Sequence, residues 1–164
     1  MALITTIGGA LTDSYVTWAE YSAYATAQGW TLAATVAADE ANLRRAVLSV
    51  DVTYSFVGQR QYQEQAREWP RIWTGLVDGW PINPDTVPVR VKNAQMELAH
   101  AVQTGSDALP VVAGVVASQR DKAGPVETET VYQGGLGVSR FTAVDRLLEP
   151  YTLGGVGTVR VMRG

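Results

Sequence analysis

Apolar and polar residues alternate with helical spacing in three stretches of this chain. The first runs from Trp18 to Gly29, where apolar positions share one face and the glycine provides a stop for the helix. It opens with Thr17 and Glu20, a pair that forms a capping box when each side chain bonds the backbone amide of the other residue. These features predict a first helix that begins directly after Thr17.

A second helix is predicted from Ala37 to Phe56, and Gly58 ends it. Its apolar positions recur at offsets of four, three and four residues, which places them on one stripe of the helix. The stripe consists of Leu43, Val47, Val50 and Tyr54.

A third helix begins near Pro88, since proline suits the first turn of a helix. Asp85 or Thr86 is available as its cap, and Gly105 closes it. Its apolar face consists of Val87, Val91, Ala94, Leu98 and Val102.

Between the second and third helices the sequence predicts a rigid corner. A short polar helix from Tyr62 to Glu68 leads into Trp69-Pro70-Arg71. Pro70 removes a backbone donor and forces the residue before it out of the α region, so the helix must stop there. A bulky indole is thereby held beside an arginine fork. Residues 72–86 are rich in glycine, proline, aspartate and asparagine and are predicted to be loop.

Asp51 flanks the apolar stripe of the second helix, where a carboxylate needs a partner. Arg60 or Arg71 comes within reach once the corner folds back. We therefore expect an ion pair that ties the second helix to the corner formed by Trp69, Pro70 and Arg71. Replacement of Asp51 by alanine should then lower the melting temperature by more than a surface substitution does.

After the third helix the hydrophobic period changes from helical to alternating. The segment from Val111 to Ser118 is rich in valine, and the segment from Val126 to Tyr132 alternates threonine and glutamate with apolar residues. The intervening Asp-Lys-Ala-Gly-Pro sequence is typical of a turn. These features predict a β-hairpin or β-arm.

A glycine-rich hinge at 133–137 precedes a last short helix, which Thr142 and Asp145 cap and Pro150 ends. The remaining residues are locally basic and are predicted to be an extended tail. The fold class that follows is mainly α: a bundle of three to five helices with a β-hairpin arm and a C-terminal tail. As one domain with extensions, the chain divides into core, arm with hinge, and terminal helix with tail at residues 1–106, 107–137 and 138–164.

Composition argues against catalysis and against cofactor binding. The 164 residues contain no cysteine and one histidine, His100, which has no serine or cysteine partner near it in the sequence. No histidine pair or carboxylate cluster has the spacing of a metal site, and the glycine-rich stretches lack the Lys-Ser/Thr pair of a phosphate loop. We expect no enzymatic activity, no cofactor and no metal. No apolar run reaches the length of a membrane span.

Aromatic content leaves nucleic-acid binding open as an alternative. Five tryptophans and seven tyrosines could provide stacking platforms for bases. However, the net charge is -3 and the arginines are scattered among acids. This distribution favours a core role for the rings on apolar helix faces, namely Trp18, Tyr21 and Tyr54.

Four segments follow one another in the chain: SYVTWAEYSAYATAQGW, NLRRAVLSVDVTYSFVGQR, EWPR and VPVRVKNAQMELAHAV. In this order they resemble phage proteins labelled DnaT-like single-stranded-DNA-binding proteins, a group that is similar to the head–tail connectors of long-tailed phages. The resemblance covers Ser14 to Tyr132 and, more weakly, the short helix near Leu147-Leu148. Its most specific pieces are Gly58-Gln59-Arg60, Trp69-Pro70-Arg71 and the helix opening at Pro88. This chain departs from the family pattern by an insertion, Ile72-Trp73-Thr74.

The resemblance implies a connector that assembles as a ring of about twelve copies beneath the portal protein. Such a ring extends the DNA channel, through which genomic DNA passes without specific binding, and offers a platform to stopper or tail-completion proteins. The protein would be made in the host cytoplasm and reside in the neck of the virion, without membrane contact. In relatives the C-terminal segment docks on the portal, and the corresponding residues here are Leu147, Leu148, Tyr151, Arg160, Val161 and Arg163.

Single-stranded-DNA binding, the activity in the family label, is the alternative function. It predicts binding that weakens with salt and falls when exposed aromatic side chains are removed. A connector instead predicts that the segment after Pro150 is required to join heads to tails.

Overall fold

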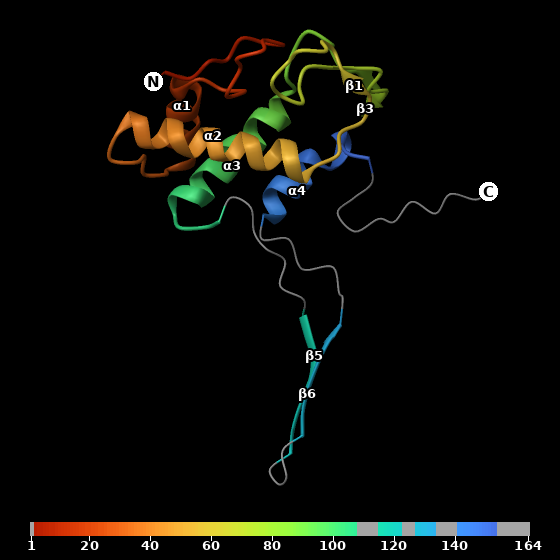
Figure 1. Ribbon diagram of the computed structural model, residues 1–164. Helices are drawn as coiled ribbons and strands as arrows, with labels where there is room; N and C mark the ends of the chain where they lie inside the picture. Colours follow the sequence, from red (N-terminus) through yellow and green to blue (C-terminus); the bar gives the residue numbers. More distant parts are fainter. Residues whose placement is uncertain (1, 108–114, 123–126, 134–140, 154–164) are drawn as a thin grey trace, which may run out of the picture. The chain divides into compact units, whose positions relative to one another are not determined.

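The computed structural model describes residues 2–107, 115–122, 127–133 and 141–153. They belong to two compact units (Figure 1). The helical unit contains the described residues up to 107 together with those from 141 onward, and the hairpin unit lies within 110–140. The segment that follows the hairpin unit in sequence therefore returns to the core that the first helices build.

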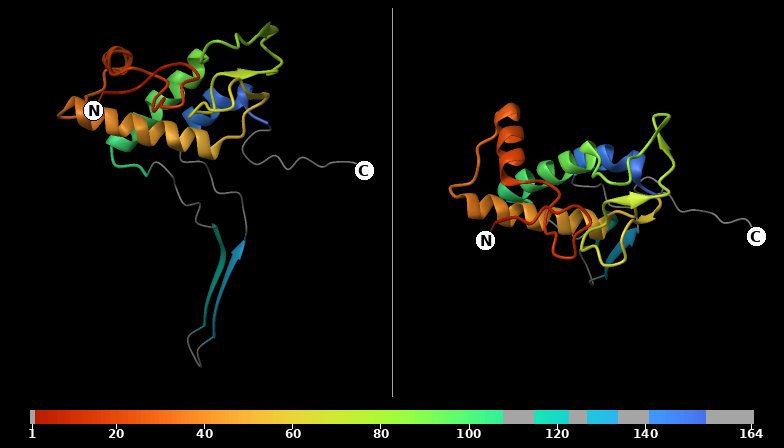
Figure 2. Two further views of the ribbon diagram at one scale, coloured as in Figure 1. Left: turned by 45° about the horizontal axis from the view of Figure 1, so that its top comes forward. Right: turned by 90° about the horizontal axis from the view of Figure 1, so that it is seen from above.

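The helical unit confirms a mainly α fold. Within it, α2 and α4 both pack on α3, while α1 contacts α2 (Figure 2). None of the helices in the described ranges is long and apolar enough to cross a membrane. The helices are α1 (Trp18–Gln28), α2 (Val36–Thr53), α3 (Val89–Gln103) and α4 (Thr142–Leu148), followed by a short 3-10 helix, Glu149–Tyr151.

The predicted start and end of α1 are both confirmed. The Thr17 side chain accepts a hydrogen bond from the Glu20 amide at 3.2 Å, and the Glu20 carboxylate accepts one from the Thr17 amide at 2.7 Å. Gly29 follows the helix with φ 72, the left-handed conformation that a glycine adopts without a steric penalty. Local sequence alone therefore determines this helix.

The predicted second helix forms, but it ends at Thr53 rather than at Phe56. Phe56 leaves the helix and pairs with Thr152 in an isolated antiparallel bridge, so a contact distant in sequence replaces the last helical turn. The apolar stripe of α2 is buried as predicted at Leu43, Val47 and Val50.

The predicted third helix also forms, and it begins without a side-chain cap. Pro88 is the residue before its first turn, and neither Asp85 nor Thr86 caps it. Asp85 instead accepts a hydrogen bond from the Gln61 amide group at 2.9 Å, and the Thr86 hydroxyl donates to a backbone carbonyl upstream. These residues are used to close the preceding turn rather than to cap α3.

The short helix predicted from Tyr62 to Glu68 is wrong: the segment consists of turns and bends. The buried side chain of Gln65 explains the difference, because it forms hydrogen bonds with backbone groups of this segment. Its Oε1 accepts from the Tyr62 amide at 3.0 Å, and its Nε2 donates to the carbonyls of Arg67 at 2.7 Å and Pro70 at 3.1 Å. A side chain that satisfies the backbone in this way competes with helix formation.

Two small antiparallel hairpins frame the loop after the corner. The first pairs β1 (Gln59–Arg60) with β2 (Arg71–Ile72), and the second pairs β3 (Leu76–Val77) with β4 (Trp80–Pro81). The second lies in the stretch predicted to be loop. Its turn is Asp78-Gly79, with φ 54 and 84, and an Asp-Gly pair between apolar residues is the sequence signal for such a turn.

The predicted β-hairpin is confirmed in the hairpin unit. Strand β5 (Val115–Lys122) pairs antiparallel with β6 (Glu127–Gln133), with one irregularity between Val116 and Ser118. The strand β5 extends through Lys122, which the sequence had placed in the turn. The predicted turn tip and glycine hinge lie outside the described residues.

The last predicted helix, α4, forms without its predicted capping box. Phe141 precedes the helix and makes no side-chain cap, while Asp145 accepts a hydrogen bond from the Tyr54 hydroxyl. That bond ties α4 to the end of α2. The core of the helical unit therefore draws on all four helices and on the corner: Tyr15, Val16, Tyr21, Leu43, Ala46, Val47, Val50, Phe56, Trp69, Val87, Val91, Ala94, Met96, Leu98, Ala99, Val144, Leu148 and Tyr151.

Candidate functional site

The Trp69-Pro70-Arg71 corner is part of the core. Trp69 is 1% exposed, and its ring makes edge-to-face contacts with Phe56 at 5.6 Å and Tyr151 at 5.7 Å between centroids. Pro70 is equally buried. Because Phe56 follows α2 and Tyr151 follows α4, the indole fastens the ends of two helices together. It is a packing residue rather than a contact surface.

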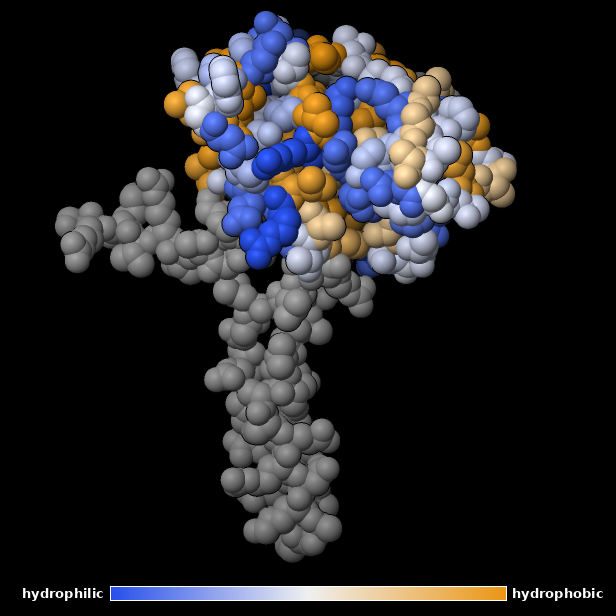
Figure 3. Space-filling view, turned by 180° about the vertical axis from the view of Figure 1, so that it is seen from behind, coloured by the Kyte–Doolittle hydropathy of each residue, from blue (hydrophilic) through white to orange (hydrophobic). Residues whose placement is uncertain are grey.

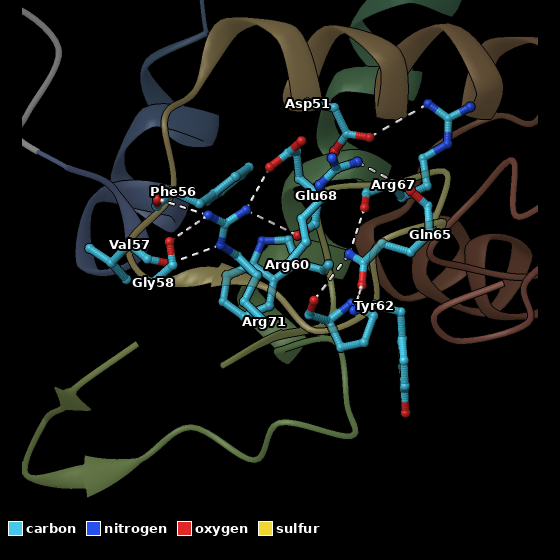
Figure 4. A network of polar contacts seen from close by, with 12 residues as sticks. Asp51, Phe56, Val57, Gly58, Arg60, Tyr62, Gln65, Arg67, Glu68 and Arg71 are labelled. Carbon is cyan, nitrogen blue, oxygen red and sulfur yellow. Dashed lines mark hydrogen bonds and ion pairs between the residues drawn. The ribbon is translucent and has the colours of Figure 1, made fainter. Parts of the chain in front are cut away.

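Arg71 acts as a clamp on the chain that leaves α2 (Figure 4). Its guanidinium donates to three successive carbonyls, those of Phe56 at 3.2 Å, Val57 at 2.8 Å and Gly58 at 2.8 Å. It also pairs with the Glu68 carboxylate at 2.5 Å. A planar fork can satisfy this many acceptors at once, whereas a lysine cannot. The clamp holds β1 and β2 at a fixed position beside the helix end.

The expected pairing of Asp51 with Arg60 or Arg71 is wrong. Asp51 pairs with Arg67, with 3.5 Å between the charged atoms (Figure 4). It also accepts a hydrogen bond from the Tyr15 hydroxyl at 2.5 Å. Arg71 is occupied by the carbonyls and by Glu68, and Arg60 donates to the Gln65 carbonyl at 3.3 Å.

Asp51 nevertheless ties α2 to the corner, because Tyr15 bridges the two. The Tyr15 oxygen accepts a hydrogen bond from the Trp69 amide at 3.2 Å while its hydroxyl donates to Asp51. Burial raises the pKa of Asp51 to about 6, and the Tyr15 and Arg67 contacts oppose that rise. Burial, with the nearby carboxylate, also raises the pKa of Tyr15 well above its ordinary value. At neutral pH the tyrosine is therefore the donor.

A second polar centre joins the N-terminal segment to α2 and α3. Gln95 is fully buried on α3, and its amide donates to the Ser14 hydroxyl at 2.8 Å and to the Leu43 carbonyl at 3.0 Å. Its oxygen accepts from the Tyr15 amide at 3.0 Å. Tyr15 is thus fixed from both sides, by Gln95 and by Asp51.

The loop beyond the corner carries a group of exposed apolar side chains, which we call the aromatic surface. The Arg90–Asp78 ion pair, at 3.5 Å, joins the start of α3 to the β3–β4 turn. In that hairpin Leu76 pairs with Pro81 and Val77 pairs with Trp80, so Leu76 and Trp80 are exposed on opposite faces of it. Apolar residues also interrupt the polar surface on the face drawn in Figure 3. The members of the aromatic surface, with their exposed fractions, are Trp73 (78%), Leu76 (68%), Trp80 (76%) and Val89 (71%).

Trp73 is held in an unfavourable backbone conformation. Its φ of 55 lies in the left-handed region, which bulky residues rarely adopt. The neighbouring chain is fixed by close packing, since a Cβ on Gly58 would lie 2.2 Å from the Ile72 carbonyl oxygen. Gly58 is therefore required for the loop to approach, and Arg71 binds its carbonyl. The buried corner serves to hold the exposed loop.

The cations of the helical unit are largely engaged by acids. Arg45 and Arg60 are the described lysine or arginine side chains that take part in none of these ion pairs. A continuous stripe of unpaired cations, which a nucleic-acid backbone would need, is therefore not present among the side chains that the structure describes. The pairs are Arg44–Asp13, Arg67–Asp51, Arg71–Glu68, Arg90–Asp78, Lys92–Glu20 and Arg146–Glu149.

The one histidine packs against an aromatic ring. The ring of His100 stacks on that of Trp30, with 4.0 Å between centroids and 4° between planes. Within the described ranges no group of three or more histidine, cysteine, aspartate or glutamate side chains could hold a metal ion. The stacking gives His100 a packing role at the end of α3.

Two of the residues expected to dock on a portal belong to the core instead. Leu148 is fully buried and Tyr151 is 7% exposed, because α4 packs on α3 and Tyr151 packs on Trp69. Leu147 is partly buried against the same core. Leu148 and Tyr151 therefore cannot contact a partner unless the core opens. The other expected docking residues, Arg160, Val161 and Arg163, lie outside the described residues.

Sequence reasoning overlooked the exposed tryptophans and the roles of Arg67 and Gln65. The Asp-Gly turn signalled the hairpin that carries Trp80. No local signal distinguishes Arg67 from Arg60 as the partner of Asp51, because that choice depends on the path of the chain between them.

A comparison with protein families places the whole chain in one of them. The model of the family described as "Putative DnaT-like ssDNA binding protein" matches residues 1–164. No curated protein matches the chain, and no solved structure does. The match confirms the DnaT-like part of the resemblance, and its description names DNA binding rather than a head–tail connector. The chain therefore belongs to the DnaT-like ssDNA-binding protein family.

Proposed function

We propose that this chain is a structural adaptor of a phage particle, a head–tail connector that assembles as a ring and binds other proteins. The observation that carries the proposal is the aromatic surface. Large apolar side chains held exposed on a rigid support are typical of protein contact sites, where tryptophans provide much of the binding energy.

The support of the aromatic surface strengthens this proposal. Trp73 keeps a strained backbone, and the Arg71 clamp and Gly58 hold the chain on either side of it. Strain of this kind persists where the exposed position is itself useful. A folded chain that needed the tryptophan only for stability would bury it.

The charge pattern favours a protein partner over DNA. Among the described residues of the helical unit, six ion pairs leave few cations for phosphate contacts, and the net charge of the chain is -3. A ring with this charge would let a polyanion pass without strong binding. The ring of about twelve copies, the portal partner and the location in the virion neck rest on the resemblance of the sequence to connectors.

Docking on the portal is assigned to the segment after Leu153. This revises the expected set, because Leu148 and Tyr151 are core residues. Of that set, Arg160, Val161 and Arg163 stay as docking residues, on the sequence alone.

Truncation of the full chain after Leu153, in the phage that encodes it, tests the connector function. A cut after Pro150 would be unsuitable because it removes Tyr151 from the core and the Leu153 amide from its bond to the Ser55 carbonyl at 2.7 Å. We expect the truncated protein to keep its helical content and melting temperature, and infected cells to accumulate unjoined heads and tails. Normal particles in electron micrographs would overturn the connector proposal. An Arg146→Gln chain, changed only on the surface, is the matched control and should give joined particles.

Single-stranded-DNA binding is the second candidate, and the family description favours it. Trp73 and Trp80 are exposed enough to stack on bases. Fluorescence anisotropy with a labelled oligothymidine, at low and high salt, tests this candidate. If the chain binds single-stranded DNA, we expect binding that weakens with salt. The Trp73→Ala/Trp80→Ala chain should lose this binding, and a Leu48→Ala chain should keep it. Absence of binding at low salt would eliminate it.

A further inference from the structure

We infer that neighbouring copies of this chain join their hairpins edge to edge, with β6 of one copy paired antiparallel to β5 of the next. This inference rests on the proposed ring and names one contact that builds it. The partner is a second copy of this chain, and both edges of the contact belong to the hairpin unit.

The β5–β6 sheet has two strands and two open edges (Figure 1). Among the described strands, none pairs with the outer edge of β5 or of β6. Natural sheets that avoid association keep their edge strands very short, whereas β5 contains eight residues and β6 seven. An isolated two-stranded hairpin is only marginally stable in water, so this one gains stability from a further strand at either edge.

The charged residues of the hairpin divide between its two edges by sign. In the antiparallel register Arg120 stands opposite Glu129, and Lys122 stands opposite Glu127. These four residues occupy alternate positions, so they share one face of the hairpin. The other face carries one charged residue in this ladder, Asp121. On the shared face, the β5 edge is therefore positive and the β6 edge is negative.

This division of charge selects which strands pair between copies. A residue within a sheet has a neighbour on each side, and the hairpin supplies only one of the two for each of these four charged residues. Pairing of β6 with β5 of the next copy supplies an opposite charge on the open side. Pairing of β5 with β5, or of β6 with β6, would place like charges opposite each other, which is destabilising. The mixed pairing joins two different edges, and such a contact generates a ring when the rotation between copies closes.

Rotation between neighbours also fixes the direction and the register of the contact. Neighbours in a ring of many copies differ by a small rotation, so β6 of one copy runs antiparallel to β5 of the next, as it does within the hairpin. With no shift along the ring axis, Glu129 again stands opposite Arg120, now across two copies. Gln119 and Thr130, a register pair on the other face, meet across the copies in the same way.

Disulfide trapping tests the contact directly, because the natural chain contains no cysteine. Full-length Gln119→Cys protein is mixed with full-length Thr130→Cys protein under mild oxidation. We expect a several-fold higher yield of the mixed disulfide dimer than in a mixture of Gln119→Cys with Val131→Cys, because position 131 belongs to the opposite face of β6. Each variant alone should give little dimer, because the contact never places the same strand of two copies side by side. Equal yields in the two mixtures would overturn the inference.

Charge reversal separates contacts between copies from contacts within one hairpin. The same cysteines are placed in an Arg120→Glu/Lys122→Glu chain, whose edges are both acidic, and in a Glu127→Lys/Glu129→Lys chain, whose edges are both basic. Every such chain has a disturbed ladder within its own hairpin. We nevertheless expect dimers from a mixture of one acidic and one basic chain, and few dimers from two acidic chains. A yield no higher than that of the Val131→Cys control in the same charge-reversed chains would contradict an edge contact between copies.

These outcomes are independent of the connector test. Trapping no higher than the control, together with unjoined heads and tails after truncation beyond Leu153, would overturn this contact and leave the connector proposal standing. Specific trapping, together with normal particles after that truncation, would support the contact between copies and overturn the connector.

Discussion

Arg71 donates a hydrogen bond to the carbonyl of Gly58 at 2.8 Å, and Gly58 is the residue that allows the exposed loop to approach the corner. A Cβ at this glycine would meet the Ile72 carbonyl oxygen at 2.2 Å. The buried arginine and the glycine thus hold one backbone arrangement between them. This backbone arrangement holds Trp73, two residues after Arg71, in its exposed position. The corner is a brace for a contact surface rather than the contact itself.

Replacement of Arg71 by lysine should destabilise the fold although the charge is kept. Lysine cannot reach three carbonyls and a carboxylate together, so buried acceptors lose their partner. We expect the free energy of unfolding to fall by about 2–4 kcal/mol in urea denaturation. Arg146→Lys, at an exposed ion pair, is the control and should change it by less than about 0.5 kcal/mol. Equal losses of unfolding free energy in the two variants would show that the hydrogen bonds of the Arg71 guanidinium do not stabilise the fold.

Gly58→Ala should be more costly than Gly29→Ala, although both glycines have a positive φ. An alanine at Gly29 meets nothing within 4 Å, so only the backbone penalty of about 1 kcal/mol applies. At Gly58 the added carbon also collides with backbone, which should cost at least about 2 kcal/mol more. Denaturation of the two variants gives the difference directly. Similar stabilities would mean that the loop can move away without penalty.

Trp73→Gly should stabilise the folded chain while it weakens the aromatic surface. Glycine relieves the strain of a positive φ, worth about 1 kcal/mol, and the exposed indole contributes little to the core. Leu76→Gly is the matched control: it removes a similar exposed group without a positive φ and should lower stability. Calorimetry should show melting temperatures that move in opposite directions. A fall in both would contradict a strained Trp73.

The carboxyl of Asp51 should make stability depend on pH in a direction unusual for an ion-paired acid. Its pKa is about 6 in the folded chain, raised from an ordinary 3.8, so the folded state binds the proton more tightly than the unfolded state. The stability contributed by this group is fully present below pH 4 and is lost as pH rises through 6. Relative to Asp51→Asn, the natural chain should therefore gain up to about 3 kcal/mol between pH 7 and pH 4.

Paired denaturation curves of the natural chain and Asp51→Asn at several pH values measure this change. Subtraction of the two curves removes the titration of every other group. A difference that stays flat, or that falls toward low pH, would contradict a buried carboxyl with a raised pKa. Arg67→Gln should raise the pKa further, because it removes the cation that opposes the effect of burial.

Local patterns in the sequence were enough to predict the four α-helices and the β5–β6 hairpin, together with the family. The Thr17–Glu20 capping box and the stop at Gly29 involve neighbouring residues only, so α1 could be located from end to end. The buried stripe of α2 follows from helical periodicity in the same way. Local interactions and repeated spacing are readable in a chain because their partners stand a few residues apart.

The polar contacts between residues far apart in the sequence, and the choice of which aromatic side chains are exposed, depend on the tertiary structure. Asp51 pairs with Arg67 rather than with Arg60 or Arg71. The segment between Arg60 and Arg71 forms turns held by the Gln65 side chain instead of the expected helix, and its path places Arg67 beside Asp51. Tyr151 became core because α4 returned to α3, which no local pattern records. Partners brought together by long loops depend on how the whole core closes. For the same reason, whether a tryptophan is buried like Trp69 or exposed like Trp73 is fixed only when the fold is complete.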